Sequence, residues 1–168
     1  MRFDKNDYRM TNILQKVSKK LHEKKLLLVS AESCTGGLLA KKITDLAGSS
    51  SIFDRGFVTY SNNSKQEMLG VQKNTIDGFG AVSENVVKEM AIGALENSNA
   101  DISIAISGVA GPDGGSKEKP VGMVCFGFMT RNDSVKAITK YFEGDRENVR
   151  VLAVDFALKE VDKLISDK

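Results

Sequence analysis

The sequence is poor in histidine and cysteine, and this shortage limits the chemistry that the chain can perform. His22 is the only histidine, and Cys34 and Cys125 are the only cysteines. Metal sites built from histidine clusters are therefore excluded, and two cysteines cannot replace them, so we expect no metal. A Ser-His-Asp triad would depend entirely on His22. Hydrolytic chemistry in this chain therefore needs a different base.

Other absences indicate where in the cell the protein works. Two cysteines without CxxC spacing do not make a disulfide scaffold. The longest apolar run is far too short to span a membrane, and the lysine-rich N-terminus lacks the apolar core of a signal peptide. We therefore expect a cytoplasmic protein with no membrane contact. A composition of 41% hydrophobic and 27% charged residues over 168 positions predicts a single globular domain, residues 1–168.

The net charge is only +2, but it is unevenly distributed. Residues 1–25 contain eight Lys/Arg against three Asp/Glu. A basic first helix could contact nucleic acid or an acidic partner. No aromatic residue interleaves with the lysines of residues 16–25, and such residues are what single-stranded nucleic acid stacks on. We interpret this helix as a solvated basic face and do not expect a nucleic-acid partner.

Apolar periodicity predicts helices that alternate with strands along most of the chain. The predicted helices cover residues 7–25, 36 or 37 to 47, 63–69, 83–96 and a C-terminal stretch from about 145. The predicted strands cover residues 26–30, 53–61, 101–107, 121–129 and 135–142, with a loop containing Gly78 and Gly80 after the third helix. This order predicts an α/β fold, a three-layer α/β/α sandwich with a mixed, mostly parallel central sheet.

Two loops follow predicted strands at places where α/β sheets bind ligands. They are A-E-S-C-T-G-G at 31–37 and G-V-A-G-P-D-G-G-S-K-E-K-P at 108–120. The first leads into a helix N-terminus, where free N–H groups and the helix dipole favour an anion, either a phosphate or a reaction oxyanion. Neither G-x-x-x-x-G-K-[ST] nor G-x-G-x-x-G is present. The stretch can therefore be a phosphate cradle, a catalytic elbow or an ordinary turn.

The first loop places two possible nucleophiles side by side, Ser33 and Cys34. A serine hydroxyl needs an activator, and a desolvated lysine can accept its proton in a Ser-Lys pair. Lys65 is the candidate base, and Tyr60 could relay a proton or orient the lysine. Cys34 would have a depressed pKa at a helix N-terminus, or it could be an ordinary core residue. The residues alone leave both nucleophiles open.

A second cluster, E-G-D-R-E-N-V-R at 143–150, begins the predicted last helix. Asp145 can cap this helix. Arg146 in the first turn is unfavourable for the helix dipole, so we expect a ligand or a carboxylate to be its partner. A planar guanidinium suits phosphate well.

Six motifs occur together and in a fixed order, from 31 to 150. They are A-E-S-C-T-G-G (31–37), F-V-T-Y-S-N-N-S-K-Q-E-M-L-G-V (57–71), G-A-V-S-E (80–84), S-G-V-A-G-P-D-G-G (107–115), E-K-P-V-G (118–122) and F-E-G-D-R-E-N-V-R (142–150). With these motifs the chain resembles, from about residue 11 to 165, the C-terminal domain of the competence/damage-inducible CinA proteins, the nicotinamide-nucleotide amidohydrolase family. The resemblance implies deamidation of nicotinamide mononucleotide to nicotinic acid mononucleotide and ammonia, without metal or organic cofactor.

The resemblance also implies roles for three residues: Ser33 as nucleophile, Lys65 as base, and Tyr60 assisting. We further expect one loop to hold the oxyanion, through backbone groups of Cys34, Thr35, Gly36 and Gly37. We then expect the second loop and the last helix to bind the substrate phosphate, through Gly108, Gly111 and Arg146. The two loops could exchange these roles.

Two other functions remain open at this point. The chain could be a catalytically silent nucleotide-binding or regulatory module, or a nucleic-acid-associated competence factor. Exposed apolar faces on the first and last helices also lead us to expect a homodimer or other homo-oligomer.

Overall fold

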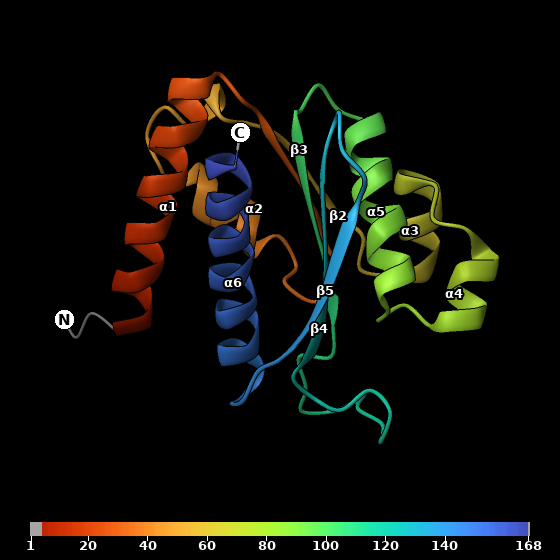
Figure 1. The fold of residues 1–168 in the computed structure, drawn as a ribbon. Helices are drawn as coiled ribbons and strands as arrows, with labels where there is room; N and C mark the ends of the chain where they lie inside the picture. The colour runs from red at the N-terminus through yellow and green to blue at the C-terminus, as the bar shows by residue number, and fades with distance from the viewer. Residues whose placement is uncertain (1–4, 168) are drawn as a thin grey trace.

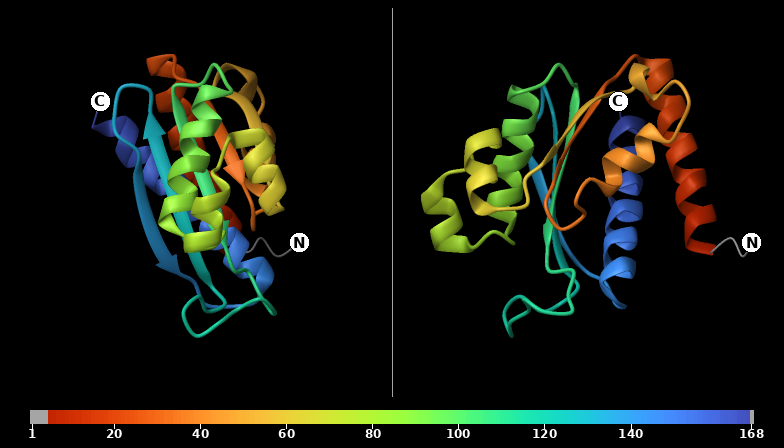
Figure 2. Two further views of the ribbon diagram at one scale, coloured as in Figure 1. Left: turned by 90° about the vertical axis from the view of Figure 1, so that its right-hand side faces the viewer. Right: turned by 180° about the vertical axis from the view of Figure 1, so that it is seen from behind.

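The computed structural model describes residues 5–167, in which helices pack on both faces of one sheet (Figure 1). One face is covered by α1 (Lys5–Lys24), α2 (Leu38–Thr44) and α6 (Arg146–Ser166). The other face is covered by α3 (Asn62–Leu69), α4 (Lys73–Phe79) and α5 (Glu84–Glu96), as the view from behind also shows (Figure 2). The predicted three-layer α/β/α sandwich is confirmed. No helix in this described part is long and apolar enough to cross a bilayer.

The sheet contains five strands in the order β2-β1-β3-β4-β5. Their bounds are β1 Leu28–Glu32, β2 Phe53–Val58, β3 Ile102–Gly108, β4 Met123–Thr130 and β5 Lys136–Tyr141. β1 pairs in parallel with β2 and β3, whereas β4 runs antiparallel to β3 and β5. Four of the five strands thus share one direction, which confirms the mixed, mostly parallel sheet. The carboxyl ends of β1, β2 and β3 meet at one edge, where ligands bind in such folds.

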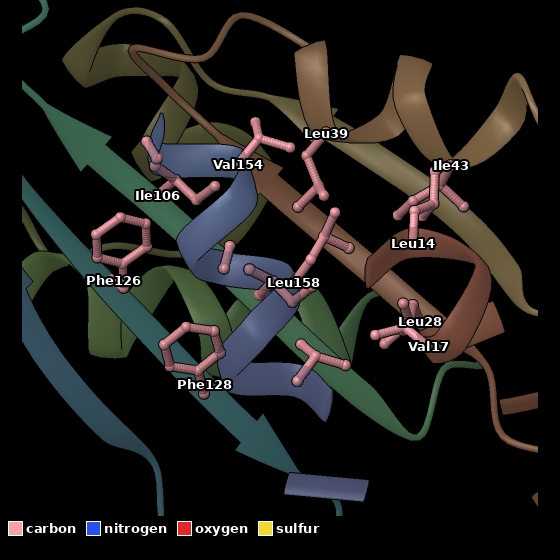
Figure 3. Close-up of a cluster of buried hydrophobic side chains, with 14 of the residues drawn as sticks. Leu14, Val17, Leu28, Leu39, Ile43, Ile106, Phe126, Phe128, Val154 and Leu158 are labelled. Carbon is pink, nitrogen blue, oxygen red and sulfur yellow. The ribbon is translucent and has the colours of Figure 1, made fainter. Parts of the chain in front are cut away.

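The core on the α6 side is formed by alternate residues of the central strands. Ile102, Ile104 and Ile106 of β3 are almost completely buried and face this side together with Phe126. Figure 3 shows the side chains of Leu39 and Val154 meeting them from α2 and α6. A fully buried side chain of this size stabilises the fold by about 1.5–3 kcal/mol. The core therefore holds α2 and α6 firmly against the sheet.

On the opposite face, two glycines allow α5 to approach its neighbours closely. A Cβ at Gly93 would overlap the carbonyl of Leu69 in α3, and one at Gly127 of β4 would overlap the carbonyl of Val87 in α5. The missing side chains thus set short distances from β4 to α5 and from α5 to α3. Consequently, α3 has a fixed position relative to the sheet.

The structure contains one helix that the sequence did not predict, α4, where we expected a loop. This helix has only seven residues, includes Gly78, and buries only Ile76, so it shows no clear apolar periodicity. Glu89 of α5 caps it, because the carboxylate accepts hydrogen bonds from the Gln72 amide at 2.8 Å and the Thr75 hydroxyl at 2.6 Å. A contact from a distant part of the chain thus stabilises α4.

Several predicted boundaries differ by one to three residues, and three of these differences have clear local causes. β1 starts two residues late because the Leu26 amide donates back to the end of α1, to the Leu21 carbonyl at 2.9 Å. β2 ends at Val58 because Ser61 caps α3. α2 starts at Leu38 because the two glycines before it have positive φ angles of 57° and 93°.

The basic face of α1 is not wholly solvated. Lys16 and Lys20 both reach Asp162 of α6, at 2.6 and 2.5 Å. Lys19 remains exposed. Part of the positive charge of the first helix therefore serves to hold α1 against α6.

Candidate active site

Ser33 and Lys65 lie in contact, although 32 residues separate them in the sequence. Ser33 directly follows β1, and Lys65 is in the first half of α3. The Lys65 Nζ donates to the Ser33 Oγ at 3.0 Å and to the Thr59 carbonyl at 2.7 Å. The lysine side chain is almost completely buried, with 1% of its surface exposed. The structure thus brings together a hydroxyl and a buried amine.

Burial lowers the pKa of Lys65, and the nearby Cys34 opposes this shift only in part. A charged ammonium has three N–H donors, but the described residues offer it two acceptors. A neutral amine likewise leaves one N–H unpaired, but it buries no charge, and its lone pair can accept from the Ser33 hydroxyl while one N–H donates to the Thr59 carbonyl. The arrangement therefore favours a lysine that can act as a base.

Cys34 does not have the depressed pKa that a helix N-terminus could give it. Burial raises the pKa of the thiol to about 12, and the carboxylate of Glu32 acts in the same direction, although the residue's own backbone amide opposes them. The side chain is 7% exposed. The expectation of a reactive thiolate is therefore wrong, and the second alternative, a small buried residue, describes Cys34.

A carboxylate already occupies the N-terminus of α2. Glu32 is 1% exposed, and its side chain accepts from the amides of Gly37 at 3.1 Å, Leu39 at 3.0 Å and Ala40 at 2.9 Å. The Gly36 amide donates to the Ser33 carbonyl at 3.0 Å. The amides of Gly36 and Gly37 are thus already used, contrary to the expectation that they hold an oxyanion. Glu32 stands inside the quoted motif, but the residue pattern did not reveal the direction of its side chain.

Other backbone donors remain available at the same end of the sheet. Between residues 5 and 167, no oxygen accepts a hydrogen bond from the amides of Cys34 or Thr35. In the second loop, Val109 donates to the Met123 carbonyl, whereas the amides of Gly111 and Gly114 have no such acceptor in this part of the chain. Cys34, Gly111 and Gly114 line the cleft described below, so their amides can receive negative charge from a ligand, whereas Thr35 is fully buried.

Arg146 connects α6 to both of the other site segments. Its guanidinium donates to the Gly111 carbonyl and to the Tyr60 hydroxyl, each at 2.9 Å. Asp145 caps α6 by accepting from the Asn148 amide, as predicted. The expected carboxylate partner of Arg146 is replaced by two uncharged oxygens. The positive charge of Arg146 therefore remains uncompensated by any carboxylate among the described residues.

These groups line one cleft of about 320 Å³, a size typical of small-molecule sites. In Figure 1, the 108–120 loop and the start of α6 lie at the same, lower end of the sheet. Of the predicted site residues, the cleft is lined by Ser33, Cys34, Tyr60, Lys65, Gly108, Gly111 and Arg146, but not by Thr35, Gly36 or Gly37. Sequence reasoning missed four further polar or backbone contributors: Asn62, Ser107, Asp113 and Gly114. Their place inside the family motifs was the available signal.

A larger hollow of about 610 Å³ lies between α1 and the Gly48–Ser51 turn, and it contains His22. The imidazole Nδ1 is 3.3 Å from the Ser51 hydroxyl and far from the cleft residues. We locate the chemistry in the smaller cleft, because only that cleft contains the buried lysine beside a hydroxyl. Across the described residues, no group of three His, Cys, Asp or Glu side chains could hold a metal ion.

Comparison with known proteins shows which family the chain resembles. Residues 10–165 match the family described as the CinA C-terminal domain. The chain is 51% identical to the nicotinamide-nucleotide amidohydrolase PncC of Enterobacter agglomerans, over 92% of this chain and 94% of that protein. It is 50% identical to the protein of the same name from Escherichia coli K12, over 91% and 93% of the two chains.

The fold also matches a solved structure closely. The crystal structure of the competence/damage inducible protein CihA from Agrobacterium tumefaciens superposes with a TM-score of 0.91 at 40% sequence identity, covering 98% of both chains. The family match, the sequence identity to these relatives and the shared fold agree with one another. The chain belongs to the CinA C-terminal domain family.

Proposed function

We propose that the chain is a nicotinamide-nucleotide amidohydrolase, which converts nicotinamide mononucleotide and water into nicotinic acid mononucleotide and ammonia. Two proteins about half identical to it over nearly their whole length have this name. One observation carries the proposal for this chain: a buried Lys65 amine lies 3.0 Å from the Ser33 hydroxyl inside a cleft. That arrangement suits attack on an amide carbonyl without histidine or metal.

In the first half-reaction, Ser33 Oγ attacks the carboxamide carbon while Lys65 accepts the hydroxyl proton. The carbonyl oxygen becomes an oxyanion in the tetrahedral intermediate. Lys65 then returns the proton to the nitrogen, the C–N bond breaks, and ammonia leaves. Tyr60 lines the same cleft, but its hydroxyl accepts from Arg146 at 2.9 Å and makes no hydrogen bond to Ser33 or Lys65, so it can assist this proton transfer only through the substrate or a water molecule. The product of this half-reaction is an ester between Ser33 and the nicotinoyl group.

In the second half-reaction, water attacks the carbonyl carbon from the position that ammonia has left, and Lys65 is again the base. Neutral Lys65 removes a proton from the water molecule, which attacks the ester carbonyl, and the proton passes to Ser33 Oγ as the C–O bond breaks. The acid product and free Ser33 result. The Thr59 carbonyl fixes Lys65 Nζ at 2.7 Å throughout, so that one amine serves both half-reactions.

The negative charges of the substrate need two sets of donors. We assign the oxyanion to the amide of Cys34, which directly follows the nucleophile, lines the cleft and has no oxygen acceptor in the described chain. We assign the phosphate to Arg146 and the free amides of Gly111 and Gly114. A guanidinium and a row of backbone N–H groups together are a typical phosphate site.

The test is turnover of nicotinamide mononucleotide, followed by release of ammonia and of the acid product. Wild type is compared with Ser33→Ala, Lys65→Ala and Cys34→Ala. We expect turnover in the wild type and in Cys34→Ala, and none in the other two. Loss of turnover in Cys34→Ala alone would contradict Ser33 as the nucleophile.

A folded wild-type protein that binds the nucleotide without turnover would support the alternative, a silent nucleotide-binding or regulatory module. Isothermal titration with nicotinamide mononucleotide separates this outcome from a failure to bind. Salt-dependent binding of DNA would instead support a nucleic-acid-associated role.

The proposal treats residues 1–168 as one amidohydrolase domain working in the cytoplasm as a homodimer or other homo-oligomer. Both cysteines are free thiols, as is typical of a reducing compartment. The apolar faces of α1 and α6, from which we expected a subunit contact, are buried in the core, so such a contact would have to use other exposed apolar side chains, such as Tyr141 on the edge strand β5. Sedimentation equilibrium measures the oligomeric state directly.

A further inference from the structure

A buried carboxylate lies directly behind the nucleophile and takes part in no step of the proposed chemistry. Glu32 is the last residue of β1, next to Ser33. Its two oxygens accept from three backbone amides of the turn and first residues of α2, at 2.9 to 3.1 Å, and from the Ser30 hydroxyl at 3.3 Å. A charge buried to this extent is costly unless it is fully hydrogen-bonded. Its bonds therefore hold the chain on both sides of Ser33.

The same residue is connected to the lysine through the backbone. The Glu32 carbonyl accepts from the Thr59 amide at 2.8 Å, and the Thr59 carbonyl accepts from Lys65 Nζ at 2.7 Å. The side chain of Glu32 thus holds the turn that carries Ser33. Its main-chain carbonyl holds Thr59, the residue that orients Lys65. Glu32 therefore contributes to the positions of both Ser33 and Lys65.

The outer side of the turn is held separately. Arg150 of α6 donates to the Thr35 carbonyl at 2.8 Å, and the Ser33 amide donates to the Ile106 carbonyl of β3 at 2.9 Å. Gly36 and Gly37 have φ angles of 57° and 93°, a left-handed backbone conformation that other residues rarely adopt, so the turn depends on these two glycines. Glu32 fixes the exit of this path into α2.

We propose that Glu32 is a positioning residue, which sets the attack geometry of Ser33 by binding the N-terminus of α2 in place of a ligand. The proposal rests on the proposed function only in naming the reaction that Ser33 performs. It has two consequences: the turn and α2 move as one unit with β1, and the substrate's anionic groups bind elsewhere in the cleft.

Two substitutions test this role. Glu32→Asp keeps the negative charge but withdraws the carboxylate by one methylene, and Glu32→Gln keeps the length but places an NH₂ group against backbone donors. We expect kcat for nicotinamide mononucleotide to fall about 100-fold in each, as a misplacement of about 1 Å at a reacting group produces. The KM should change by less than about threefold, because the cleft residues assigned to the phosphate are untouched.

The matched control is Glu89→Gln. Glu89 also caps a helix from a distance, since it binds the start of α4 through the Gln72 amide and the Thr75 hydroxyl. Neither α4 nor Glu89 lines the cleft. We expect this variant to lose stability but to keep the wild-type kcat. An equal fall of kcat in Glu89→Gln would mean that a lost helix cap, and not the position of Ser33, explains the result.

A second readout does not depend on the natural substrate. A fluorophosphonate probe reacts with an activated serine, and Ser33→Ala gives the background rate. We expect the labelling of Ser33 to slow about 100-fold in Glu32→Asp, in parallel with kcat. If the wild type is labelled but leaves nicotinamide mononucleotide intact, the proposed function fails and the labelling still tests Glu32. Wild-type labelling in a folded Glu32→Asp variant would overturn the positioning role.

Discussion

Replacing Lys65 by methionine tests the base directly, because methionine keeps a long unbranched side chain and removes only the amine. The Nζ lies 3.0 Å from the Ser33 Oγ and 2.7 Å from the Thr59 carbonyl, and no other acceptor within the described chain contacts it. General acid–base catalysis by a positioned side chain contributes about 10²–10⁴-fold. We expect kcat in Lys65→Met to fall by a factor in that range.

The pH dependence of the wild type gives a second measure of the same group. Lys65 must be neutral to accept the Ser33 proton, so kcat/KM rises about tenfold per pH unit below its pKa and then levels off. Burial holds the pKa of Lys65 below its usual value. The plateau should therefore begin at a lower pH than an exposed lysine would give.

The stability of the protein should depend on pH through the same residue. Because the pKa of Lys65 is lower in the folded than in the unfolded state, the unfolded chain binds more protons between the two values. The free energy of unfolding contributed by Lys65 therefore increases with pH across this window and is lost as pH falls through the folded pKa. Lys65→Met should remove this dependence.

The assays are ammonia release from pH 6 to 10 and urea unfolding over the same range. Lys65→Met loses one hydrogen bond to the Thr59 carbonyl, which costs about 1 kcal/mol, but it no longer buries an amine. The variant should stay folded. A kcat within tenfold of wild type, or a rising pH limb that survives in Lys65→Met, would refute Lys65 as the base.

Three further predictions concern residues around the site and the core. Cys34→Ala should keep turnover, and iodoacetamide should leave the wild type active, because burial raises the pKa of this thiol to about 12. Gly93→Ala should destabilise the fold by about 1–3 kcal/mol in urea unfolding, since its Cβ overlaps the Leu69 carbonyl, whereas Gly78→Ala, with open space around it, should stabilise α4 by about 0.5–1 kcal/mol. Burial alone would raise the pKa of Asp162, but the ammonium groups of Lys16 and Lys20 hold this pKa below its usual value. Asp162→Asn should therefore cost up to about 1 kcal/mol at neutral pH, and this difference should disappear in acid as the wild-type carboxylate protonates.

Most of the fold could be predicted because its elements have strong local signals. The alternation of D-I-S-I-A-I-S gave β3, since its isoleucines face one core and Ala105 the other. Asp145 caps α6 as predicted, and α5 begins after Ser83, at the predicted position. Short α4 was missed because Glu89, a residue of another helix, stabilises it. Contacts between distant segments leave no periodic trace in the sequence.

The candidate site was predicted less evenly. The residue types indicated that Ser33 needs a base other than histidine and made Lys65 the candidate, and the family resemblance strengthened that assignment. The contact between them depends on the parallel pairing of β1 with β2, which places α3 beside the end of β1. Residue order alone did not distinguish Ser33 from Cys34, because both are buried to a similar extent and the choice depends on which side chain contacts Lys65. The structure shows that this side chain is Ser33.

The placement of Glu32 also explains how Lys65 can remain neutral. A phosphate bound at the N-terminus of α2 would add a charge of about −2 near the lysine and favour its ammonium form. Glu32 fills that terminus with a carboxylate whose charge is met by three backbone amides. Burial is accordingly the main cause of the pKa shift of Lys65. We propose that the phosphate binds near Arg146, whose own positive charge offsets it, so that the pKa of Lys65 can stay below its usual value.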